Sequence, residues 1–170
     1  MIKSNTGRPI YFSRTSGGYG SQELGLGPYL VTQGLARKLV PDIPRADSRD
    51  TMLVPGEGFV DVPRTTVLWD SVFQAPKSVI EKGDWVDRAS VGIPALYVST
   101  GFMLSEAQRT LGNNAAAQRV LATAEGVARA TRLSDLFNAV QQLPPLGVEG
   151  DSRSTAIPLP IRPDSPKTKQ

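Results

Sequence analysis

Apolar positions recur at helical spacing most regularly in two consecutive segments in the middle of the chain. In residues 93–111, one helical face collects Leu96, Thr100, Met103, Leu104, Ala107 and Leu111. In residues 115–131, a similar stripe consists of Ala117, Val120, Leu121, Ala124, Val127 and Ala128. Between the two segments, Gly112-Asn113-Asn114 offers a C′ glycine and an asparagine N-cap. The pattern predicts an antiparallel helical hairpin, with small alanines that let the two helices approach closely.

The same periodicity predicts a helix on either side of this hairpin. The first begins at about Pro63, and one face of it carries Val67, Leu68, Val72 and Phe73. Pro76 lies too deep in this pattern to be an N-terminal proline, so the helix should end or kink near Ala75. A further helix is expected at 134–143, because Ser134 is a suitable N-cap.

The N-terminal part of the chain has strand and turn signals instead. Residues 8–15 are rich in β-forming side chains and predict a strand that stops at a glycine loop, 16–28. Pro28 suits the first turn of a short helix that would run to about Gly34. A second apolar run follows at 35–40 and is closed by a proline.

The chain therefore divides into three regions of different character. Residues 41–51 are polar and predict an exposed loop. Residues 52–62 predict a broken strand or an extended segment, because a proline and two glycines interrupt them. We expect a strand and loop region at 1–62, a helical region at 63–143 and an extended tail at 144–170. The predicted fold class is α+β, with a small sheet region followed by the helical hairpin.

The tail is set apart by its prolines. Six prolines fall between residues 144 and 170, which excludes a helix or a central strand and favours an extended, polyproline-like chain. Apolar side chains alternate with prolines near its middle, and a pure spacer would not need them. We expect such a segment to gain order by lying along another surface. The predicted partner-binding residues are Ile157, Pro158, Leu159, Pro160 and Ile161.

Composition removes most classes of catalytic site. The chain of 170 residues has no Cys and no His, so it cannot form a disulfide, a thiolate nucleophile, a zinc knuckle or a Ser-His-Asp triad. Its 19 Lys and Arg residues against 16 Asp and Glu residues give a net charge of +3, spread without the basic cluster of a nucleic-acid-binding protein. We expect no catalytic residue, no cofactor, no metal site and no nucleic-acid partner.

Membrane contact, if any, should be peripheral. No stretch of the sequence approaches the length of about 18 apolar residues that spans a bilayer. The N-terminal residues lack the apolar segment of a signal peptide, so none is expected.

Two pairs of carboxylates and the glycine loop are the remaining candidates for chemistry. Glu57 with Asp61, or Asp84 with Asp87, could serve acid–base catalysis or Ca²⁺ binding. Both pairs sit in turn-like segments, where acidic residues are common, and a Ca²⁺ loop needs about five or six oxygen ligands. The glycine loop has neither the P-loop nor the dinucleotide-binding spacing, so a plain surface loop is the favoured interpretation.

Large aromatic side chains in the helical region could line a ligand pocket. They are Trp69, Trp85, Tyr97 and Phe102. Aromatic residues at helical spacing more often pack in a core, and we favour that interpretation.

The helical hairpin resembles a single tetratricopeptide-type repeat. Gly112, Ala117, Leu121 and Ala124 match the Gly, Ala, large apolar and Ala positions of that pattern. One repeat cannot bury both of its faces, so it must pack on the N-terminal half or on another protein.

Ordered motifs in the first half resemble a known protein family. They run in the order Arg8-Pro9-Ile10-Tyr11-Phe12-Ser13-Arg14-Thr15, Leu24-Gly25-Leu26-Gly27-Pro28-Tyr29-Leu30, Gln33-Gly34-Leu35-Ala36-Arg37-Lys38-Leu39-Val40-Pro41 and Gly58-Phe59-Val60-Asp61-Val62. Over roughly residues 5–135, the chain resembles the extracytoplasmic C-terminal region of bacterial multi-span membrane proteins related to protein O-mannosyltransferases. The resemblance implies a small α/β piece followed by tetratricopeptide-like helices, and no catalytic residue here.

These observations predict a non-catalytic, membrane-extrinsic subunit that stabilises a larger membrane protein complex through its helical face and its tail. The resemblance implies the periplasmic face of the inner membrane, with the cytoplasmic face as the alternative. A photosynthetic reaction centre–antenna complex is one conceivable setting. The alternative function is a glycosyltransferase-associated or sugar-binding extracytoplasmic domain, which would use Glu57 and Asp61 or a cleft lined by Trp69, Trp85 or Tyr97.

Overall fold

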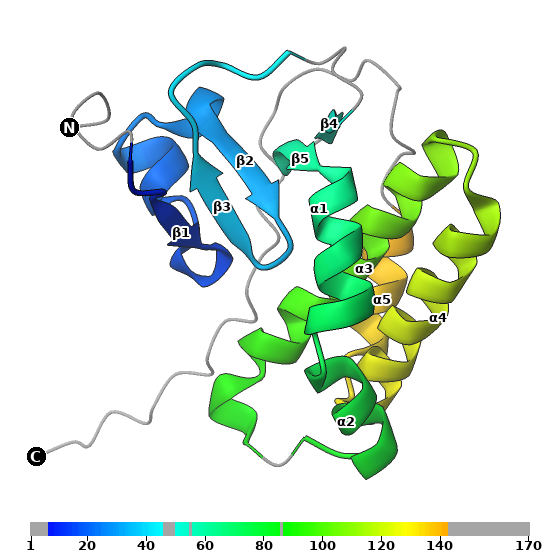
Figure 1. Ribbon diagram of the computed structural model, residues 1–170. Coiled ribbons are helices and arrows are strands. Elements are labelled where there is room, and N and C mark those ends of the chain that lie inside the picture. The colour runs from blue at the N-terminus through cyan, green and yellow to red at the C-terminus, as the bar shows by residue number, and fades with distance from the viewer. Residues whose placement is uncertain (1–6, 46–49, 55, 86, 143–170) are drawn as a thin grey trace, which may run out of the picture.

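The computed structural model describes residues 7–45, 50–54, 56–85 and 87–142. A five-stranded sheet from the N-terminal part of the chain lies beside a group of helices formed by the rest (Figure 1). The fold is therefore α+β, as predicted. The tail at 144–170 lies outside the described residues, and so do the partner-binding residues predicted in it, which are Ile157, Pro158, Leu159, Pro160 and Ile161.

The sheet is mixed, and a parallel pair of strands lies inside it. Its strands are β1 (Tyr11–Ser13), β2 (Leu30–Gln33), β3 (Ala36–Leu39), β4 (Thr51–Val54) and β5 (Gly58–Asp61). They lie in the order β1-β3-β2-β5-β4, in which β2 and β5 are parallel and the other pairs are antiparallel. Both edge strands are short, which limits pairing with another sheet.

The short helix expected from Pro28 to Gly34 is wrong. The proline does begin a turn, but this is a 3-10 turn at Gly27–Tyr29, and the chain then enters β2. Leu30, Val31 and Thr32 are all buried in the sheet, which favours strand over helix. A two-residue turn, Gly34-Leu35, then leads into β3. The first residue of this turn, Gly34, has φ 62°, a backbone conformation that favours glycine.

The broken strand expected at 52–62 is a hairpin of two strands, β4 and β5. Val54 pairs with Gly58, and Met52 pairs with Val60 across the hairpin. Gly56 and Gly58 have φ values of 77° and 79°, so the predicted break coincides with the connection between the strands. The first strand, expected at 8–15, is shorter than predicted and covers only Tyr11–Ser13.

The apolar face predicted for the helix from Pro63 is wrong in part, because Val67 and Val72 are exposed and the buried side carries Thr65 and Trp69 instead. The structure describes five α-helices. They are α1 (Val62–Val67), α2 (Ala75–Lys82), α3 (Gly92–Thr110), α4 (Asn114–Ala130) and α5 (Ser134–Gln141). A π-helical turn, Leu68–Val72, extends α1. Among the described helices, none combines the length and apolar character that crossing a membrane requires.

The predicted end of the first helix near Ala75 is present, but Pro76 is an N-terminal proline, which the sequence interpretation had excluded. The π-helical turn ends at Phe73, whose φ of −78° and ψ of 102° are extended. This residue resets the chain direction, and α2 starts afresh at Ala75 with Pro76 in its first turn. A proline is well tolerated there because the first helical N–H groups have no intrahelical acceptor.

The α3–α4 hairpin is formed as predicted, with a change at its connection. Gly112 has φ 80° and ends the first helix as a C′ glycine. Asn113 occupies the N-cap position of α4, but its side-chain amide donates to Gln108 Oε1 at 2.8 Å instead of capping the helix. Leu111 is half exposed and leaves the predicted apolar stripe.

Close packing at Gly101 sets the distance between α3, α4 and Trp69. A Cβ atom built on Gly101 would lie 2.7 Å from the Ala124 Cβ and 2.7 Å from Cη2 of Trp69. Both neighbours are buried and held by the surrounding core, so neither can move aside cheaply. Gly126 on α4 is different, because its built Cβ meets the flexible end of Ile80, with Cδ1 at 2.9 Å.

We predict that Gly101→Ala lowers the free energy of unfolding by about 1–3 kcal/mol through overpacking. The matched change Gly126→Ala should leave it unchanged or raise it by up to about 1 kcal/mol, because alanine is the better helix former and Ile80 can rotate away. Urea denaturation of both variants measures the difference. Equal effects at the two positions would contradict the packing argument.

Candidate functional site

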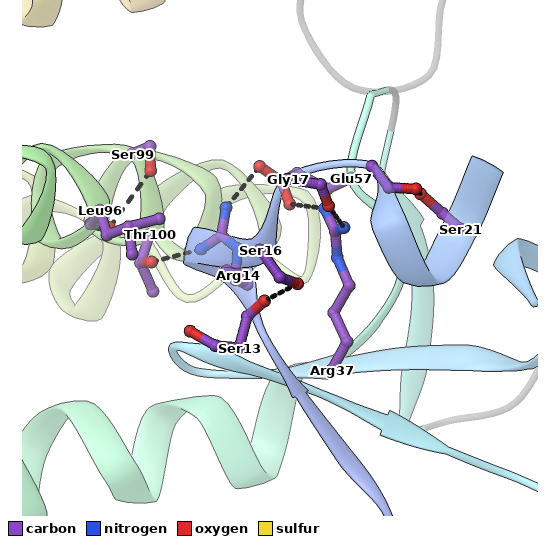
Figure 2. Close-up of polar contacts among 11 residues, drawn as sticks. Ser13, Arg14, Ser16, Gly17, Ser21, Arg37, Glu57, Leu96, Ser99 and Thr100 are labelled. Carbon is purple, nitrogen blue, oxygen red and sulfur yellow. Dashed lines mark hydrogen bonds and ion pairs between the residues drawn. The ribbon is translucent and has the colours of Figure 1, made fainter. Parts of the chain in front are cut away.

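The most tightly enclosed charge among the described residues belongs to Arg14. This residue follows β1 directly, and only 4% of its side chain is exposed. Its guanidinium donates from Nη1 to Thr100 Oγ1 on α3 and from Nη2 to Glu57 Oε1 in the β4–β5 connection, both at 2.5 Å (Figure 2). The side chain thereby links the first strand, a hairpin and the longest helix.

A second arginine completes this charge cluster of Arg14, Arg37 and Glu57. Arg37 on β3 places Nη2 at 3.6 Å from Glu57 Oε2, and its Nη1 donates to the carbonyl of Gly17 at 3.3 Å (Figure 2). Glu57 Oε2 is buried and accepts no hydrogen bond from the described residues. Two cations therefore share one carboxylate, with the charge of Glu57 held between them.

Burial is the main influence on the protonation of Arg14. Desolvation lowers the pKa of the Arg14 guanidinium, the nearby Glu57 carboxylate raises it and the Arg37 cation lowers it further. An arginine still remains protonated in a protein, so the cluster holds two positive charges and one negative charge. A buried charge of this kind is tolerated only while its partners stay in place.

The structure does not bring Glu57 and Asp61 together as an acid–base pair. Glu57 directly precedes β5 and belongs to the charge cluster, whereas Asp61 is the last residue of that strand. Asp61 Oδ1 accepts the N–H of Arg64 at 2.9 Å as the N-cap of α1, and its Oδ2 accepts from Gln33 Nε2 at 2.8 Å. Both carboxylates therefore hold backbone elements in position.

Asp84 and Asp87 also make local contacts. Asp84 Oδ1 accepts the N–H of Trp85 at 2.8 Å. Asp87 accepts from the Ser90 hydroxyl at 2.6 Å and from the N–H of Ala89 at 3.0 Å, which caps the 3-10 turn at Arg88–Ser90. These bonds, the Ser90 hydroxyl first, lower the pKa of the Asp87 carboxyl, whereas a general acid needs a raised pKa. Within the described ranges, no three acidic residues gather where they could hold a metal ion.

Two of the four predicted aromatic residues pack in the core, namely Trp69, which is buried, and Tyr97, which packs against it. Trp69 is 7% exposed, its ring lies 6.5 Å from that of Tyr97, and Phe73 meets Tyr97 edge to face at 5.6 Å. Burial raises the pKa of Tyr97. Trp85 borders an apolar cavity of about 20 Å³ together with Tyr97, enough for a single water molecule but not for a sugar. Phe102 is half-buried on α3.

The glycine loop folds into a helical turn that packs against the sheet. Residues Tyr19–Glu23 form a π-helical turn, and Gly20 lies so close to Phe12 that a Cβ there would be 3.1 Å from the ring. The Gly17 carbonyl accepts from Arg37, as described above. The loop thus packs against the sheet and supports the charge cluster.

The sequence reasoning missed an open groove between α4 and α5. It has a volume of about 320 Å³, at the lower end of the range of about 300–1,000 Å³ for small binding sites. Its lining residues are Glu125, Ala128, Arg129, Ser134, Phe137, Asn138 and Gln141. The polar residues Ser134, Asn138 and Gln141 recur at i, i+4 and i+7 along α5. This spacing could have predicted from the sequence that they share one face of the helix.

Comparisons with known proteins add no relative to this picture. No family model, no curated protein and no solved structure matches the chain.

We predict that Arg14→Met lowers the free energy of unfolding by about 3 kcal/mol, because Thr100 and Glu57 lose their buried donor. A suitable control is Arg129→Met, which removes an exposed arginine that lies 3.6 Å from Glu125. That change should cost less than about 0.5 kcal/mol. Chemical denaturation compares the two variants, and similar losses would contradict a special role for the buried pair.

We also predict that Ser90→Ala raises the pKa of Asp87 toward its ordinary value, because the main bond to the ionised carboxylate is lost. The stability that this carboxylate contributes is present at neutral pH and is lost as pH falls through its lowered pKa. The chemical shift of the Asp87 carboxyl carbon as a function of pH reports the change. The control Ser99→Ala removes a hydroxyl that donates to the Leu96 carbonyl and should leave this titration unchanged.

Proposed function

We propose that the chain is a non-catalytic, membrane-extrinsic structural subunit that stabilises a larger membrane protein complex. The observation that supports the proposal is that the candidate carboxylates bind other groups of the protein itself. Glu57, Asp61 and Asp87 each hold backbone or a buried arginine in position. The chemistry available in the described residues serves the fold, which leaves outer surfaces as the functional parts.

The proposed contact surfaces are the helical face and the tail. We treat the α3–α4 pair with α5 as a tetratricopeptide-like unit, since such units commonly present surfaces to other proteins. Ala117 and Ala124 are buried in this hairpin, which supports the likeness. In the tail, Ile157, Leu159 and Ile161 are the proposed apolar contacts. The sequence resemblance favours the periplasmic face of the inner membrane, and a reaction centre–antenna complex is the proposed setting.

Purification from native membranes tests this proposal. The tagged chain, extracted in mild detergent, should elute with at least one membrane protein in a fixed molar ratio that survives gel filtration. A peripheral attachment also predicts release from the membranes at high salt or alkaline pH without detergent. Recovery of the chain alone, as a monomer, would contradict the proposal.

A variant of the tail should separate partner binding from folding. We predict that the triple change Ile157→Asp, Leu159→Asp and Ile161→Asp abolishes co-purification, because it places charges on the apolar contacts. The matched control adds the same three charges to the same tail at other positions: Ser152→Asp, Ser154→Asp and Ser165→Asp. Retention of the partner by the first variant, or its loss from both, would contradict a specific apolar contact.

A further inference from the structure

We draw no further inference here: the strongest candidate, the open hollow of about 320 Å³ between α4 and α5, has an apolar floor of Ala128 and Phe137 that is only 1% and 5% exposed beneath a rim of solvated polar side chains, and nothing in the structure shows what covers it.

Discussion

The buried guanidinium of Arg14 connects parts of the chain that are distant in sequence. It reaches Thr100 on α3 and Glu57 between β4 and β5, at separations of 86 and 43 residues. A charge removed from water in this way is stable only when its partners are held at bonding distance. The sheet must therefore lie against α3 in one position, and Arg37 with Gly17 extends the same constraint to the glycine loop.

The helical half is positioned by packing instead of charge. Gly101 allows Trp69 and Ala124 to approach α3 at a distance that no side chain would permit. This contact fixes α4, and α5 then packs against both α3 and α4 through Phe137. The groove lies between α4 and α5. Its donors lie on the surface, where they can meet an external group without weakening the core.

Buried polar groups and exposed polar groups have different roles in this structure. Glu57 is engaged by Arg14 and Arg37, and Asp61 caps the N-terminus of α1, so these two carboxylates satisfy buried and terminal polar groups. The polar side chains of the α4–α5 groove have no such duty. The polar groups of this groove are two neutral amides, a hydroxyl and one ion pair, and they lie in an open surface hollow.

Helical periodicity was sufficient to predict α3, α4 and the glycine between them, because helix faces and C′ glycines depend on neighbours within a few residues. The strand signals of the N-terminal part then predicted the α+β class. Sequence reasoning failed at Pro28 and Pro76, where the same local signal fits a helix start, a turn or a kink. Only the tertiary structure decided that Glu57 meets Arg14 and that Asp61 does not meet Glu57. Such pairings depend on strand order and helix packing, which link residues far apart in the chain and leave no periodic trace in it.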